Sequence, residues 1–117
     1  MSGNGNRSSG WRWLPFELHT HTVHSDGVHT LAELAHSAKA IGLAGFALTD
    51  HNTMAGGLER ERVAKDTGLS IIQGMEWSTF FGHMVVLGIR DYVDWRDLGI
   101  CNIHKGIHKV HEQGGIV

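Results

Sequence analysis

The chain of 117 residues has little cysteine, proline or tyrosine, since each occurs only once. The single cysteine, Cys101, excludes an internal disulfide and a cysteine-based zinc site, and it is typical of a reducing compartment such as the cytoplasm. Basic residues are fewer than acidic ones, 10 against 12, so no basic field argues for nucleic acid or a membrane surface as a partner. No apolar run approaches the roughly 20 residues of a membrane span. The composition therefore favours one globular domain in the cytoplasm.

The N-terminus also lacks a hydrophobic stretch. Its first ten residues are rich in Gly, Ser and Asn, which is not typical of a secretory signal. We expect residues 1–13 to be a flexible lead-in and residues 14–117 to form the domain, with Cys101 in its core.

Histidine, in contrast, is abundant, with ten residues in the chain. Histidines and carboxylates recur in short groups, each in the first loop or at the predicted end of a strand. The groups are His19-Thr20-His21, His24-Ser25-Asp26-Gly27, Thr49-Asp50-His51-Asn52, Gly74-Met75-Glu76 and Gly82-His83. Such side chains are costly at the end of a buried strand unless something uses them. A cluster of divalent metals that activates water would use them.

The apolar pattern predicts an α/β fold. Strands are predicted at 14–21, 43–48, 69–74 and 81–89, and a further strand begins at 116. Helices are predicted at 31–41, with a capping box of Thr30 and Glu33, at 55–66, and around 100–110. Gly42 and Gly68 end the first two helices. Alternating strands and helices indicate a mainly parallel sheet, in which sites lie at the carboxyl ends of the strands.

In this order, the motifs resemble the PHP family, named after polymerase and histidinol phosphatase. The spellings Asp-His-Asn-Thr, Gly-His-Met-Val-Val-Leu-Gly and Asp94-Trp95-Arg96 are most similar to its CehA/McbA-type metallohydrolases. The resemblance covers residues 16–117. It implies the N-terminal portion of a distorted (β/α)7 barrel that holds up to three divalent ions of zinc, manganese or iron.

The resemblance also implies ligand sets. His19, His21 and Glu76 would bind one ion, Glu76 would bridge to a second ion at His83, and Asp26 and His51 would bind a third. The family's later ligands, in a His-Pro and an Asp-x-His motif, have no counterpart before Val117. We therefore expect a truncated domain whose open sheet edge is covered by a homo-oligomer.

Alternatives remain for several of these residues. Asp26 could cap the turn at Gly27, and His83 could be an ordinary strand histidine. Asp50 is expected to orient a neighbouring histidine. His24 could donate a proton to substrate or be a solvated loop residue.

Other residues are expected to have structural roles. Trp11 and Trp13 are expected over the end of the barrel, and Trp77 and Trp95 in the pocket wall. The stripe of His104, His108 and His111 is interpreted as a polar helix flank, because no carboxylate lies among them.

The first functional hypothesis is a metal-dependent hydrolase acting on a small-molecule phosphoester, ester or amide. Its catalytic residues would be Glu76, His83 and His24, and the water nucleophile would be held by the ions at His19, His21, Glu76 and His83. The alternative is a catalytically inactive metal-binding fragment that serves as an interaction or assembly piece. A proofreading exonuclease is disfavoured, because no feature of the sequence adds a nucleic-acid groove.

Overall fold

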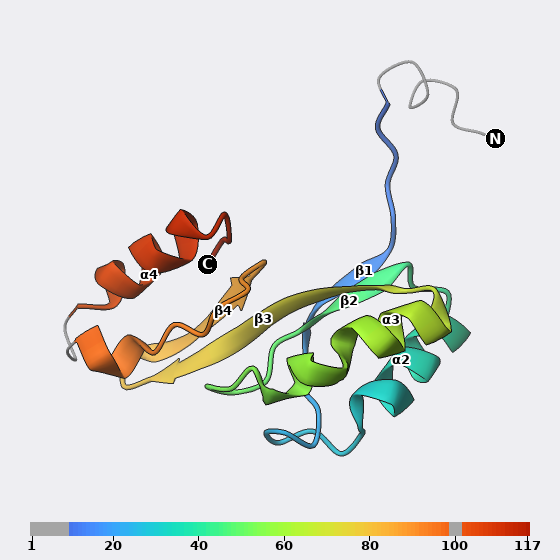
Figure 1. Cartoon of the computed structure of the whole chain (residues 1–117), viewed down its shortest axis with the longest axis horizontal. Helices are drawn as coiled ribbons and strands as arrows, with labels where there is room; N and C mark the ends of the chain where they lie inside the picture. The colour runs from blue at the N-terminus through green and yellow to red at the C-terminus, as the bar shows by residue number, and fades with distance from the viewer. Residues whose placement is uncertain (1–9, 99–101) are drawn as a thin grey trace.

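A computed structural model describes residues 10–98 and 102–117, so Cys101 lies outside the described residues. Four strands form one sheet in the order β1-β2-β3-β4 (Figure 1). Their bounds are Phe16–Thr20 for β1, Gly45–Leu48 for β2, Ser70–Thr79 for β3 and Gly82–Leu87 for β4. The first three strands are parallel, and β4 runs antiparallel to β3. The predicted, mainly parallel α/β sheet is confirmed.

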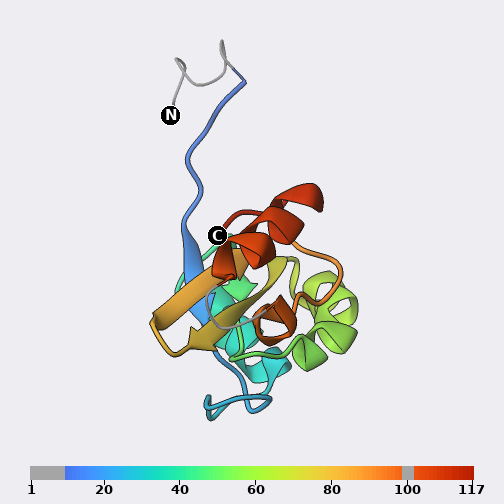
Figure 2. The same cartoon turned by 90° about the vertical axis from the view of Figure 1, so that its left-hand side faces the viewer.

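The helices make two separate apolar layers with this sheet. Helix α2 (Leu31–Ala40) and helix α3 (Arg60–Thr67) lie side by side and pack on β2 and β3. Helix α4 (Ile103–Glu112) and the short 3-10 helix η2 (Trp95–Leu98) pack against the β3–β4 hairpin around Met75, Trp77 and Val110. Two perpendicular views place α4 apart from α2 and α3 (Figures 1 and 2).

Local signals explain the ends of α2 and α3. The Thr30 hydroxyl accepts a hydrogen bond from the Glu33 backbone N–H, and the Glu33 carboxylate accepts one from the Thr30 N–H, which confirms the capping box. Gly68 ends α3 in the left-handed conformation, at φ 76°. The predicted second helix begins as a 3-10 turn, η1 (Ala55–Glu59). Two glycines in that turn disfavour a regular α-helix.

Strand β3 is longer than predicted. We expected it to end at Gly74, but it continues to Thr79, because the backbone from Gly74 onward pairs with β4. Glu76 therefore lies within a strand, opposite Val85, and does not follow it. The predicted strand at the C-terminus is present as one bridge, between Leu87 and Ile116.

Residues 10–15, which precede β1, extend away from the sheet in both views (Figures 1 and 2). Trp11 and Trp13 are 77% and 94% exposed, so the expectation that they pack over the end of the barrel is wrong. Within the described residues β1 pairs with β2 alone and forms an edge of the sheet. A second copy covering this edge stays a prediction. No helix in the described part of the chain has the length and apolarity to span a membrane.

Candidate metal centre

The strand register brings the predicted ligand residues to one place. His51, just after β2, forms a bridge with Glu76 of β3, and the Glu76 N–H donates to the Asp50 carbonyl. On β4, His83 pairs with Ser78, which lies on the same face of β3 as Glu76 because side chains alternate along a strand. His19 lies near the end of β1, the strand that pairs with β2. Six ligand-type residues meet here: His19, His21, Asp26, His51, Glu76 and His83.

The Glu76 carboxylate is the centre of the cluster. Only 4% of the residue is exposed. Its Oε1 lies 2.8 Å from His19 Nε2 and 3.0 Å from His21 Nε2, and its Oε2 lies 2.9 Å from His83 Nδ1. One carboxylate therefore faces imidazoles through both of its oxygens.

Hydrogen bonding alone does not account for the triangle of Glu76, His19 and His21. The two imidazole Nε2 atoms lie 3.1 Å apart, so all three edges are close to 3 Å. If both Nε2 atoms carry a proton and donate to the carboxylate, their two N–H groups face each other. If one Nε2 instead accepts a hydrogen bond from the other imidazole, the accepting Nε2 carries no proton to donate to Glu76. Ligands held about 2.1 Å from one ion lie about 3.0–3.4 Å apart. The three atoms fit one face of a metal coordination polyhedron.

A second set of atoms surrounds His51. Its Nε2 lies 3.2 Å from Asp26 Oδ2, and its Nδ1 lies 2.6 Å from the Ser78 hydroxyl. The rings of His21 and His51 are stacked, with centroids 4.4 Å apart. The other carboxylate oxygen, Asp26 Oδ1, lies 3.5 Å from His21 Nδ1. The Asp26 carboxylate therefore lies close to both histidines.

The charge state of Glu76 follows from its neighbours. Burial alone would raise its pKa, but hydrogen bonds with His19 and His83, together with electrostatic interactions with His19 and His51, hold the pKa below its usual value. The group is therefore an ionised acceptor at neutral pH, which is the form that binds a cation.

Asp50 has a different role from the one expected. It is buried, and its carboxylate accepts hydrogen bonds from the Thr22 N–H at 2.6 Å, the Thr22 hydroxyl at 2.7 Å and the Ser25 hydroxyl at 2.7 Å. The expectation that Asp50 orients a histidine directly is wrong, since these donors leave it holding the backbone of the loop after β1. That loop carries His21 and Asp26.

Gly27 closes the same loop. An added Cβ would clash with the backbone of His21 and Thr22, so only glycine permits this close approach. The Gly27 N–H also donates to the Thr22 carbonyl at 2.9 Å. The Ser-Asp-Gly sequence is therefore part of the fold of the loop after β1, which we call the ligand loop.

Histidines outside the cluster lie on the surface. His24 is exposed, lies outside the three groups of ligand atoms found in the described residues, and has its ring near Gly56. A catalytic role for His24 stays a prediction. On α4, His104, His108 and His111 are exposed, and His108 lies 3.7 Å from Glu112.

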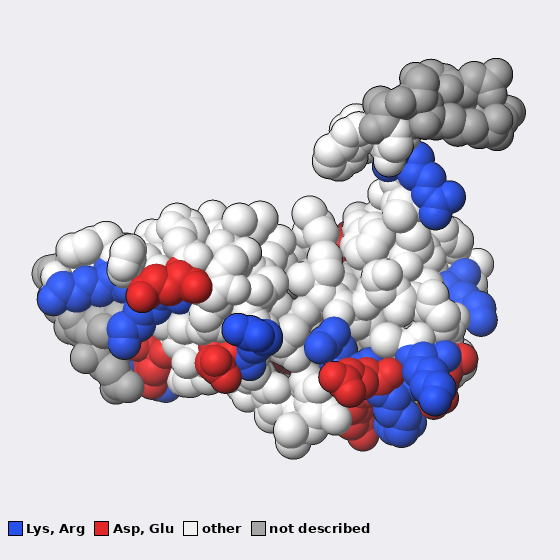
Figure 3. All heavy atoms as spheres, turned by 45° about the horizontal axis from the view of Figure 1, so that its top comes forward, with Lys and Arg blue, Asp and Glu red and all other residues white. Residues whose placement is uncertain are grey.

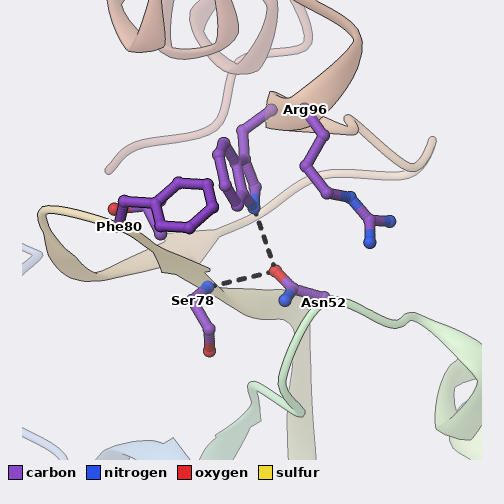
Figure 4. A pocket seen from close by; sticks show the side chains of 6 residues that line it. Asn52, Ser78, Phe80 and Arg96 are labelled. Carbon is purple, nitrogen blue, oxygen red and sulfur yellow. Dashed lines mark hydrogen bonds between the residues drawn. The ribbon is translucent and has the colours of Figure 1, made fainter. Parts of the chain in front are cut away.

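A cavity of about 370 Å³ adjoins the cluster, and its lining residues are Asn52, Ser78, Thr79, Phe80, Trp95 and Arg96 (Figure 4). Trp95 lines it as predicted. Trp77 does not, because it is fully buried and donates from Nε1 to the Val93 carbonyl.

The motif analysis quoted Asn52 without giving it a role, and it did not identify Ser78. The Asn52 side-chain oxygen accepts from the Ser78 N–H at 3.0 Å and from Trp95 Nε1 at 3.2 Å. Asn52 has φ 49°, a conformation that asparagine tolerates better than most residues. The position of Asn52 directly after His51 was a sequence signal that could have identified it. No comparable signal in the sequence marks Ser78.

These features define a class: α/β proteins that gather histidines and carboxylates from neighbouring strands and the loops after them into a candidate metal-ligand cluster. The chain belongs to the PHP domain family, which matches residues 17–113.

Relatives agree with this assignment. The chain is 47% identical over 96 residues to a 5'-3' exoribonuclease of Haemophilus influenzae, covering 82% of this chain and 30% of that protein. It is 34% identical over 94 residues to a 3',5'-nucleoside bisphosphate phosphatase of Chromobacterium violaceum, covering 77% of this chain and 33% of the relative. The chain thus spans about a third of the length of these two relatives.

A solved structure shows the same fold. A proposed metal-dependent phosphoesterase from Bifidobacterium adolescentis superposes with a TM-score of 0.57 and 33% identity, over 63% of this chain and 27% of that one. The chain therefore matches part of a larger protein.

Proposed function

We propose that this chain supplies the metal-binding part of a hydrolase that cleaves a phosphoester with water as the nucleophile. The observation that carries this proposal is the triangle of His19, His21 and Glu76, whose spacing suits metal ligation better than hydrogen bonding. The phosphatase and phosphoesterase names of similar proteins support the choice of a phosphoester.

The residues suggest a division of ligands. Oε1 of Glu76 would share one ion with His19 and His21, and Oε2 would share a second ion with His83. Zinc, manganese and iron suit this mixture of imidazole and carboxylate. When bound, such ions lower the pKa of water toward neutrality and polarise the oxygens of the substrate.

His51 and Asp26 would hold a third ion. His21 and His51 each belong to two of the groups, but a neutral imidazole has one lone pair to offer a metal. Assigning His21 to the Glu76 group and His51 to Asp26 gives each ring one ion. The Ser78 hydroxyl supports this assignment, because a proton on His51 Nδ1 donated to Ser78 leaves Nε2 free toward Asp26.

The remaining roles concern protons and substrate choice. His24, exposed on the loop before α2, would protonate the leaving oxygen of the substrate. The face shown in Figure 3 supports a small-molecule substrate, because its Lys and Arg side chains lie beside Asp and Glu and form no continuous basic track there.

A 5'-3' exoribonuclease is the second candidate function. It is favoured by the Haemophilus influenzae relative, which is 47% identical to the chain. A 5'-phosphorylated oligoribonucleotide, offered beside a mononucleotide, distinguishes the two functions by which substrate is hydrolysed.

The test compares metal-loaded chain with the variants E76Q and E61Q. Glu61 is an exposed carboxylate on α3 and serves as the matched control. We expect hydrolysis of p-nitrophenyl phosphate or bis(p-nitrophenyl) phosphate that requires added Mn²⁺ or Zn²⁺, is lost in E76Q and is kept in E61Q. Hydrolysis of p-nitrophenyl acetate alone would shift the reaction class to esters. Bound metal without turnover of any substrate would favour the non-catalytic alternative and overturn the proposal for this chain.

A further inference from the structure

The cavity beside the cluster offers a place for a second part of the substrate. We propose that it binds the nucleobase of a nucleotide substrate, with Phe80 as the stacking surface. This inference rests on the proposed function, because it names the substrate class of that site.

The first argument is position. Ser78 links the cavity to the cluster, since it lines the cavity while its hydroxyl contacts His51 Nδ1 at 2.6 Å. A group bound in the cavity therefore lies one side chain away from the proposed metal ligands. A phosphate attached to that group could reach the cluster.

The second argument is the exposed aromatic side chain at the edge of the cavity. Phe80 is 78% exposed at the tip of the β3–β4 hairpin. It meets Trp95 at an interplanar angle of 86°, with ring centroids 6.2 Å apart, so most of its surface is left to solvent. Exposed aromatic side chains are the surfaces on which nucleic-acid bases stack.

The third argument is the set of polar groups that face Phe80. In Figure 4, Phe80 and Arg96 lie on two sides of the cavity above Asn52 and Ser78. The Asn52 side-chain oxygen is occupied by Ser78 and Trp95, whereas its amide nitrogen makes no hydrogen bond within the described residues. That nitrogen can donate to a ring nitrogen or a carbonyl of a base.

Arg96 supplies an oriented cation. Its Nε and one terminal nitrogen donate to the two Asp94 oxygens at 2.9 and 3.1 Å. The second terminal nitrogen makes no hydrogen bond to any described residue. This bidentate pair fixes the guanidinium at the cavity, and the remaining N–H groups can meet a ribose hydroxyl or a phosphate oxygen.

The size of the cavity indicates how large a ligand it can hold. About 370 Å³ is at the lower end of the range of small-molecule pockets, roughly 300–1,000 Å³. It therefore has room for one nucleoside unit.

The test measures binding without turnover. The whole chain is treated with EDTA and titrated calorimetrically with AMP and, separately, with ribose 5-phosphate, which has no base. We expect AMP to bind more tightly than ribose 5-phosphate. F80A should weaken AMP binding about 5- to 150-fold, the range for loss of one stacked base, and F80W should retain it.

Phe81 provides the matched control. It lies at the same hairpin tip and is 76% exposed, but it lines a separate cavity with His83 and Met84. F81A should leave AMP binding unchanged.

Equal affinity for AMP and ribose 5-phosphate, no AMP binding, or equal effects of F80A and F81A would overturn the nucleobase site. Because chelated protein is used, AMP binding without metal-dependent hydrolysis would contradict the proposed function and leave the site standing.

Discussion

Replacing Asp50 by asparagine should unfold the ligand loop while leaving every proposed metal ligand in the sequence. Asp50 is buried at the end of β2, and its carboxylate receives one backbone and two hydroxyl hydrogen bonds from Thr22 and Ser25. These three bonds connect β2 to the loop after β1. The D50N substitution changes one charged oxygen into an amide nitrogen with almost no change in volume.

The expected cost follows from the three bonds. A hydrogen bond to a charged group contributes about 1.5–3 kcal/mol, and a neutral one contributes about 0.5–1.5 kcal/mol. In D50N, the remaining oxygen can keep the bonds from the Thr22 N–H and the Ser25 hydroxyl as neutral bonds. The Thr22 hydroxyl must turn its proton away from the new amide nitrogen. The free energy of unfolding should therefore fall by about 2–4 kcal/mol.

Urea denaturation of metal-free protein measures this loss, and a metal titration of the folded protein measures the accompanying loss of affinity. D66N is the matched control, because Asp66 is an exposed carboxylate on α3. A D50N midpoint equal to those of the wild type and D66N would refute the reasoning that Asp50 holds the loop.

Three further predictions concern the same loop, the cluster and α2. G27A should lower both thermal stability and metal affinity, because the added methyl group clashes with the backbone of His21; an unchanged melting temperature would contradict this. S78A should weaken metal binding about 10- to 100-fold, as expected for loss of the group that orients a ligand such as His51; equal affinities in a calorimetric titration would show that the hydroxyl is dispensable. Hydrogen bonds of the helix cap lower the pKa of Glu33, so its stabilising contribution is present above the unfolded-state pKa and disappears as the pH falls through the folded-state pKa. Thermal unfolding of wild type and E33Q should therefore differ near neutral pH and converge at acidic pH, and a constant difference would argue against the cap.

The elements specified by local signals were predictable. Helix α2 begins at its capping box, and α3 ends at Gly68 as expected. The end of β3 was not predictable in this way, because its second half is stabilised by pairing with β4 and not by an apolar run. Long-range pairing of that kind leaves no periodic signal in the strand itself.

In the candidate site, too, residues in local sequence motifs were predictable, whereas residues whose roles depend on long-range contacts were not. The histidine and carboxylate motifs identified the residues that meet around Glu76. The supporting groups were missed or misassigned, because their roles depend on the tertiary fold. Ser78 reaches His51 only because β3 continues past Glu76, and Asp50 contacts the loop after β1 only because β1 and β2 are adjacent.

The most direct test of the metal centre is the metal content per chain, measured by mass spectrometry on protein purified without chelator. The wild type is compared with the double variant H19A/H21A and with H104A/H108A, which removes two exposed histidines of α4. We predict one or more equivalents of zinc, manganese or iron in the wild type and in H104A/H108A, and a loss of metal in H19A/H21A. Equal metal content in all three proteins, or no metal in the wild type, would contradict a metal centre at His19, His21 and Glu76.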